Sequence, residues 1–108
     1  MTGIATADPV AVNAFVTSID RKDKQGCIDV FAPGARFIDV GADYSERIEW
    51  FCNTVIDTNG TYTVLSMSTD GDTTRWDLSF RADNYRLEGT STLKGAEGKI
   101  IDLTIGPR

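Results

Sequence analysis

The stretch Cys27-Ile-Asp-Val-Phe-Ala-Pro-Gly-Ala-Arg-Phe-Ile-Asp39 decides the fold, because its pattern predicts a helix that ends at Pro33-Gly34 and turns at once into a strand. We expect Arg36 to face water. The alternation of side chains along a strand then places Ala35, Phe37 and Asp39 together on the inward face. A carboxylate therefore stands where an apolar residue is expected.

Three helices are predicted in the first half of the chain. Asp8 can cap the first, with Pro9 at its first position and apolar residues three and four apart at Val12, Phe15, Val16 and Ile19. Asp23 can cap a short second helix that carries Cys27, Ile28 and Phe31 and ends at Pro33.

The third helix is expected to begin near Asp43 to Ser45, because Asp43 and Glu46 have the spacing of a capping box. Asn59-Gly60 is a typical end for such a helix. The residues that it should bury are Ile48, Phe51, Cys52 and Val55.

From Thr61 onward the sequence predicts an antiparallel meander of four strands, separated by Asp70-Gly71, Asp83-Asn84 and residues 95–98. A two-residue turn at Asp70-Gly71 would place Leu65 opposite Trp76 and Thr63 opposite Leu78. A second such turn, at Asp83-Asn84, would place Phe80 opposite Leu87. These residues would share one apolar face.

The final turn sets which face of the last strand points inward, since a slip of one residue exchanges the two faces. We favour a three-residue loop with Gly98 in the left-handed conformation, which turns Ile101, Leu103 and Ile105 inward. A four-residue loop would turn Asp102 and Thr104 inward instead. The outer face is then half polar and suits either solvent or a homodimer interface; it carries Tyr62, Arg75, Asp77, Glu88, Thr90, Thr92 and Asp102.

The composition fits one globular domain spanning residues 1–108, with 41% hydrophobic and 25% charged residues. The net charge of -5 and the lack of a Lys/Arg cluster argue against nucleic-acid or anionic-membrane partners. The first seven residues do not form a secretory signal, and we expect a cytoplasmic protein. In that setting Cys27 and Cys52, on the apolar faces of two predicted helices, should be reduced and buried.

The sequence contains no histidine, which removes Ser-His and Cys-His nucleophilic pairs and histidine zinc sites. Asp57, Asp70 and Asp72 do not have the spacing of a calcium-binding loop. We therefore expect no metal site, and any chemistry should depend on Asp, Glu, Tyr, Lys or water.

The order of elements resembles the nuclear transport factor 2-like superfamily, which includes ketosteroid isomerases, SnoaL-like polyketide cyclases, epoxide hydrolases and non-catalytic dimerising domains. The segments that carry the resemblance are Phe31-Ala-Pro-Gly-Ala-Arg-Phe-Ile-Asp39 and Gly98-Lys-Ile100. The resemblance implies a cone-shaped, cystatin-like α+β fold, with N-terminal helices on a curved, mainly antiparallel sheet. A cavity between the two layers is expected.

The resemblance to ketosteroid isomerases implies that Asp39 is a general base, because it ends the first strand as their catalytic aspartate does. SnoaL-like cyclases also use an aspartate in an apolar pocket. The oxyanion donors of the isomerases would fall at Phe15 and at Gly89 or Thr90, and none of these matches. Alternatively, Asp39 caps a backbone turn beside Gly41 or pairs with an arginine.

Two functions from different classes follow. The first is binding or cofactor-free acid-base conversion of a small hydrophobic molecule, with Asp39 as the base. Its pocket would be lined by Phe15, Phe37, Tyr44, Trp50, Trp76 and Leu78. The second is a non-catalytic ligand-binding or dimerisation domain whose pocket is filled. Arg75-Trp76-Asp77 also resembles the Arg-x-Asp pair of epoxide hydrolases, which makes such an enzyme a second alternative, but we favour an exposed pair that solubilises the protein or joins subunits.

Overall fold

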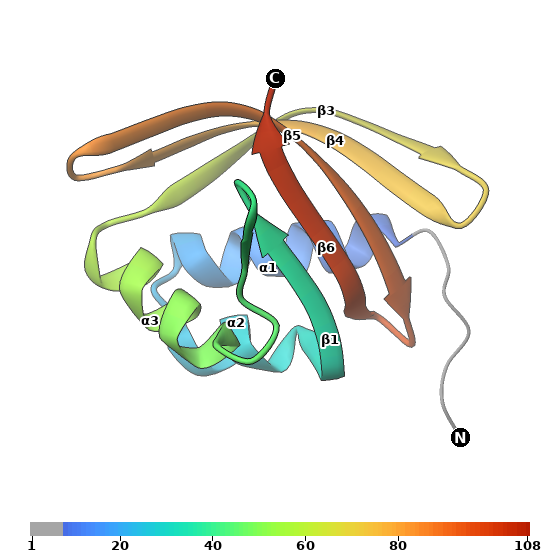
Figure 1. Cartoon of the computed structure of the whole chain (residues 1–108), viewed down its shortest axis with the longest axis horizontal. Coiled ribbons are helices and arrows are strands. Elements are labelled where there is room, and N and C mark those ends of the chain that lie inside the picture. The colour runs from blue at the N-terminus through green and yellow to red at the C-terminus, as the bar shows by residue number, and fades with distance from the viewer. Residues whose placement is uncertain (1–7) are drawn as a thin grey trace.

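The computed structural model describes residues 8–108 and shows three helices packed on one face of a curved, six-stranded sheet (Figure 1). The helices are α1 (Pro9–Asp20), α2 (Lys24–Asp29) and α3 (Ile48–Asp57). The strands are β1 (Phe31–Asp39), β2 (Ala42–Asp43), β3 (Thr61–Asp70), β4 (Thr73–Ala82), β5 (Tyr85–Ala96) and β6 (Lys99–Pro107). Across the sheet they lie in the order β2-β1-β6-β5-β4-β3. Strands β1 and β6 are parallel, and the other neighbouring strands are antiparallel. The predicted α+β class is confirmed.

Helix α1 begins as the sequence predicts. The Asp8 carboxylate accepts a hydrogen bond from the Ala11 backbone N–H at 3.1 Å, and Pro9 occupies the first turn. This arrangement satisfies a backbone donor that the helix itself leaves unpaired. The helix buries Val12, Phe15 and Ile19 against the sheet.

The junction between α2 and β1 differs from the prediction. Helix α2 ends at Asp29, so Phe31 already belongs to β1 and Pro33-Gly34 lies within that strand. The pairing of β1 with β6 shifts register between Phe31 and Arg36, and Gly34 has a φ of 76° there. Proline lacks a backbone N–H, and an irregularity of this kind accommodates it without breaking a regular ladder. Beyond the irregularity, Ala35 and Phe37 are buried and Arg36 is exposed, as expected.

Helix α3 begins later than the capping-box pattern predicts. Asp43 pairs with Ile38 in the short β2 strand, and its carboxylate accepts a hydrogen bond from the Ser45 backbone N–H at 2.9 Å. Asp43 therefore stabilises a turn rather than the start of a helix. Helix α3 buries Phe51, Cys52 and Val55, as predicted, whereas Ile48 is only half-buried.

The four-stranded meander is confirmed, but the predicted register between β3 and β4 is wrong. The turn residues are Gly71 and Asp72, and the pairing shifts between Val64 and Ser66. As a result, Leu65 is 51% exposed, while Tyr62 pairs with Phe80 and is buried. An irregularity of one residue exchanges the faces of a strand, which moves Tyr62 from the predicted outer face to the interior.

The β5–β6 turn is shorter than predicted. Ala96 pairs with Lys99, so Glu97 and Gly98 form a two-residue turn in which both have positive φ. A further register shift follows between Lys94 and Gly95. Ile100 is consequently buried in place of the half-buried Ile101, while Leu103 and Ile105 point inward as expected.

Aromatic side chains fill much of the interior between α1 and the sheet. The Phe15 ring lies 5.9 Å from that of Phe31 and 6.5 Å from that of Trp76. The Phe37 ring lies 4.6 Å from that of Phe51, with the two planes at 85°. Such edge-to-face contacts add to the stabilisation from burial. These rings are buried in the core, and a cavity lies beside them.

Candidate functional site

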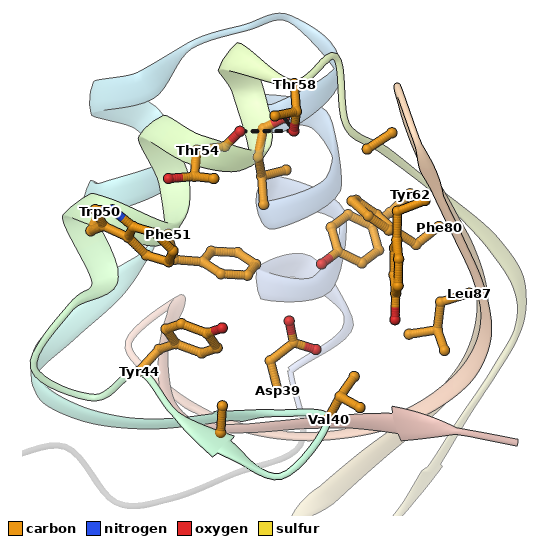
Figure 2. A pocket seen from close by; sticks show the side chains of 14 residues that line it. Asp39, Val40, Tyr44, Trp50, Phe51, Thr54, Thr58, Tyr62, Phe80 and Leu87 are labelled. Carbon is orange, nitrogen blue, oxygen red and sulfur yellow. Dashed lines mark hydrogen bonds between the residues drawn. The ribbon is translucent and has the colours of Figure 1, made fainter.

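A cavity of about 360 Å³ opens between α3, the β1–β2 turn and the inner face of β3–β5 (Figure 2). This volume is within the range of small-molecule sites. Six of the described side chains on its wall are aromatic: Tyr44, Trp50, Phe51, Tyr62, Phe80 and Tyr85. The cavity is thus an apolar, aromatic space that is open to solvent.

Asp39 lies on the wall of this cavity at the end of β1 (Figure 2). Strand pairing holds its backbone in place, because it pairs with Ala42 on one side and Ile105 on the other. Among the described residues, none donates a hydrogen bond to its carboxylate or forms an ion pair with it. Burial without such a partner raises the pKa of Asp39 to about 6, because desolvation penalises the charged form.

Two tyrosine hydroxyls turn toward this carboxylate from different elements (Figure 2). Tyr62 comes from β3, and Tyr44 from the segment between β2 and α3, where its backbone N–H donates to the Phe37 carbonyl at 2.8 Å. Burial and the nearby Asp39 charge raise the pKa of Tyr62 well above its ordinary value. Tyr62 therefore remains a neutral hydroxyl that can donate a hydrogen bond into the cavity.

One rim of the cavity is formed by stacked aromatic rings. The Tyr44 and Trp50 rings lie 5.9 Å apart with an interplanar angle of 11°. The Arg47 guanidinium carbon lies 5.0 Å from the Tyr44 ring centroid and 5.2 Å from that of Trp50. Cation–π contacts of this length stabilise the rim even though Trp50 is 52% exposed.

The β1–β2 turn next to Asp39 is strained. Its two residues, Val40 and Gly41, have φ values of 50° and 80°, and the Val40 backbone N–H donates to the Ile105 carbonyl at 2.8 Å. This left-handed conformation suits glycine but is unfavourable for a β-branched residue. Strained residues of this kind concentrate at functional sites, and Val40 lies on the cavity wall.

Replacing Val40 by asparagine is expected to raise the free energy of unfolding by about 1 kcal/mol, because asparagine tolerates the left-handed conformation. Urea unfolding followed by circular dichroism measures the change. The matched control is Val10→Asn, which alters an exposed valine in the helical backbone of α1 and should give no gain. A variant at position 40 that is no more stable than the original would contradict the assignment of strain.

The structure divides the predicted site residues into two groups. Asp39, Tyr44 and Trp50 lie on the wall of the cavity. The other four are almost fully buried in the core and are absent from the cavity wall: Phe15, Phe37, Trp76 and Leu78. Three of them lie behind rings of the wall, because Phe15 and Trp76 contact Tyr62 and Phe37 contacts Phe51. The placement of all four in the core corrects the expectation that they would line the pocket.

Several cavity residues were missed by sequence reasoning. Tyr62 was assigned to the outer face, and Tyr85, Phe51, Phe80 and Val40 were not assigned to the pocket. The predicted pairing of Phe80 with Leu87 is confirmed, and both residues line the cavity. This pair could have located the cavity from the sequence. Residues next to it on the inner face, near the Asp83-Asn84 turn, line the same cavity.

The other motifs lie away from the cavity. Arg75 is exposed, and the Asp77 carboxylate accepts a hydrogen bond from the Ser66 hydroxyl at 3.1 Å and lies 3.7 Å from the Arg108 guanidinium. Trp76, between them, points into the core. The Arg-x-Asp pair therefore faces away from the cavity that contains Asp39, as predicted, because alternation along β4 places it on the face opposite to Trp76.

No described helix is long and apolar enough to cross a membrane. Within residues 8–108, no group of three or more Cys, Asp or Glu side chains is arranged to hold a metal ion. The outer sheet face carries the Arg36–Asp102 ion pair at 3.3 Å. A homodimer through that face stays a prediction.

No protein-family model matches this sequence, and no curated protein is significantly similar to it. Solved structures do resemble it. A computationally designed 17-OHP binder has a TM-score of 0.80 at 19% identity, over 95% of this chain and 93% of that one. An NTF2-like protein of unknown function from Cytophaga hutchinsonii has a TM-score of 0.76 at 14% identity, over 95% and 93%. A protein of ketosteroid isomerase-like fold from Catenulispora acidiphila, in complex with trimethylamine, has a TM-score of 0.76 at 14% identity, over 92% and 85%.

These similarities show that the chain has the nuclear transport factor 2-like fold that its sequence predicts. Proteins of this fold differ widely in activity, and the identities are too low to carry a function across. The function must be argued from the cavity and its residues.

Proposed function

We propose that the cavity binds a small hydrophobic molecule and that Asp39 acts on it as a general base, in the manner of a cofactor-free isomerase or cyclase. One observation carries the proposal: a single, desolvated carboxylate lies on the wall of an aromatic cavity of about 360 Å³. A half-buried carboxylate that has no partner among the described residues is unfavourable for folding, and such groups are common at functional sites.

The chemistry follows from the charge state of Asp39. An ionised carboxylate would remove a proton from the carbon beside a ligand carbonyl, and the electron pair would move onto the carbonyl oxygen. A pKa of about 6 makes Asp39 a stronger base than an ordinary aspartate while it is still ionised at neutral pH. The neutral Tyr62 hydroxyl, or that of Tyr44, is available to stabilise the developing oxyanion.

Two of the structurally similar proteins support a ligand-binding role. One is a designed 17-OHP binder, and the other is in complex with trimethylamine. The resemblance to ketosteroid isomerases and SnoaL-like cyclases, which rests on the position of Asp39, supports the acid-base part of the proposal.

Asp39→Asn is expected to slow proton abstraction by a factor of about 100 or more, because asparagine cannot accept the proton. The reaction is measured directly as exchange of hydrogen for deuterium beside the carbonyl of hydrophobic ketones in heavy water, followed by NMR. This readout does not require knowledge of the natural product. Binding is measured in parallel by quenching of Trp50, which lies at the cavity rim.

Asp70→Asn is the matched control, because it removes the same charge from an exposed position at the end of β3. It should leave both exchange and binding unchanged. Exchange that is equally fast in the original protein and in Asp39→Asn would remove the catalytic part of the proposal. The binding part would fail if no hydrophobic ligand quenched Trp50.

The second candidate is a ligand-binding or dimerisation domain without catalysis. It is favoured by the residues at the positions where ketosteroid isomerases carry their oxyanion donors, because these residues do not match those donors. Phe15 has no hydroxyl and is buried in the core. A side chain at Gly89 would bring its Cβ to 2.7 Å from the Gly106 carbonyl oxygen, and Thr90 is exposed. Under this candidate, exchange remains slow in every variant. Ligands then quench Trp50 if the domain binds them, and do not quench it if the domain only dimerises.

A further inference from the structure

The charge on the cavity wall is negative. Asp39 is the only acid among the described lining residues, and neither lysine nor arginine is among them. The chain contains no histidine. Arg36 pairs with Asp102 on the outer face, and Arg47 lies against the rim rings rather than on the cavity wall. An ionised Asp39 therefore has no counter-ion from the described residues.

The aromatic walls also favour a positively charged ligand. The face of an aromatic ring carries negative electrostatic potential and attracts cations, most strongly where water is excluded. The rim shows this preference, because the Arg47 guanidinium lies 5.0 Å and 5.2 Å from the Tyr44 and Trp50 ring centroids. The same two rings border the cavity, together with Tyr62 and Tyr85.

A ligand anion would meet the opposite situation. It would lie in a low-dielectric space beside a carboxylate, without a positive group from the described lining residues to balance it. A neutral hydrophobic molecule would fill the space but leave the ionised carboxylate unpaired. A hydrophobic cation satisfies both the carboxylate and the rings.

We propose that the ligand is a small organic cation, a tertiary or quaternary ammonium with apolar substituents, whose charged group lies beside Asp39. Its apolar part would contact Phe51, Phe80 and Leu87 on the cavity wall. This inference rests on the proposed function, since it names the chemical class that the cavity binds.

Binding of such a cation is linked to pH. The other titratable side chains on the cavity wall are Tyr44, Tyr62 and Tyr85. Burial and the nearby Asp39 charge raise the pKa of Tyr62 well above its ordinary value. Asp39 changes charge near its raised pKa of about 6. Affinity for a cation is therefore highest above that pKa and decreases as the pH falls through it.

Two probes that differ by one charge test the inference. Phenyltrimethylammonium and tert-butylbenzene have the same shape, and the quaternary nitrogen cannot lose a proton, so any pH dependence belongs to the protein. Binding is measured by NMR shifts of the Asp39 and Tyr62 backbone amides in the full chain. The pKa of Asp39 is about 6. At a pH above this value, the cation is expected to bind about tenfold more tightly than its neutral isostere. Below that pH most of the advantage should disappear.

Asp39→Asn should abolish the pH-dependent advantage of the cation, while Asp70→Asn, which removes an exposed charge, should preserve it. If Asp39→Asn does not fold, the pH dependence in the unmodified protein still decides the question. Equal binding of both probes, or a charge preference that survives in Asp39→Asn, overturns the inference but leaves the proposed binding function intact. Absence of binding by either probe also overturns it, and the proposed function fails with it only if hydrophobic ketones do not bind either.

Discussion

Trp76→Ala is expected to lower the free energy of unfolding by about 3–5 kcal/mol, the range for a large aromatic side chain removed from a core. Trp76 is 1% exposed, and its ring lies 6.2 Å from that of Tyr62 and 6.5 Å from that of Phe15. Helix α1 and strand β3 both pack on it, so neither can fill the space without losing other contacts. Urea unfolding followed by circular dichroism measures the loss.

Trp50→Ala is the matched control, because Trp50 is 52% exposed at the cavity rim and should contribute about 1 kcal/mol or less. Trp76→Phe should cost less than Trp76→Ala for a separate reason. The Trp76 indole N–H is buried and has no hydrogen-bond partner among the described residues, and phenylalanine removes this unpaired donor. If Trp50→Ala were the more damaging substitution, the division between core and cavity wall would be wrong.

The elements that could be predicted from the sequence are those set by local signals. Asp8 and Pro9 define the start of α1, and the change to β-branched and aromatic residues at Thr61 marks the start of the meander. The inward position of Asp39 followed from alternation alone, since strand geometry fixes which residues share a face. These arguments need no knowledge of distant contacts.

The errors arose where one residue changes the register. The shift between Val64 and Ser66 and the shift between Lys94 and Gly95 moved Tyr62 and Ile100 inward. No local pattern distinguished these irregular strands from regular ones. An error of one residue in the register exchanges the inner and outer faces for every residue beyond it. Tyr62 was therefore left out of the predicted site because of an error in strand pairing, not because of its residue type.

The candidate site was only partly predictable for another physical reason. Phe15, Phe37, Trp76 and Leu78 are apolar and point inward, which is equally true of the wall of a cavity and of a closed core. Hydrophobic alternation identifies the inner face but not where packing is incomplete. That depends on how α3 is placed over the sheet, which no short motif encodes.

Asp39→Asn is expected to stabilise the folded protein above pH 6, the folded-state pKa of Asp39, although it removes the proposed base. The folded state raises this pKa from 3.8 to about 6, so between these values it keeps a proton that the unfolded chain releases. Because the folded state then binds more protons, stability decreases as the pH rises through this window, and the full penalty is present above it. Since the carboxyl group is partly exposed, solvent screening reduces the penalty to about 1–2 kcal/mol.

The pH dependence separates this effect from a general gain in packing. Asparagine has nearly the same shape as aspartate but does not ionise. Below pH 3.8, the ordinary pKa of aspartate, Asp39 is protonated in both the folded and the unfolded state. In that range Asp39→Asn should have the same free energy of unfolding as the original protein. The gain should develop as the pH rises toward 6 and then level off. Asp70→Asn, at an exposed position, should show no such gain.

Urea unfolding across this range measures both variants. A gain in the free energy of unfolding that is equal at low and neutral pH would show that the Asp39 charge is not the cause. A gain confined to the higher pH, together with lost proton exchange, would show that the protein retains this carboxylate for function at a cost in stability.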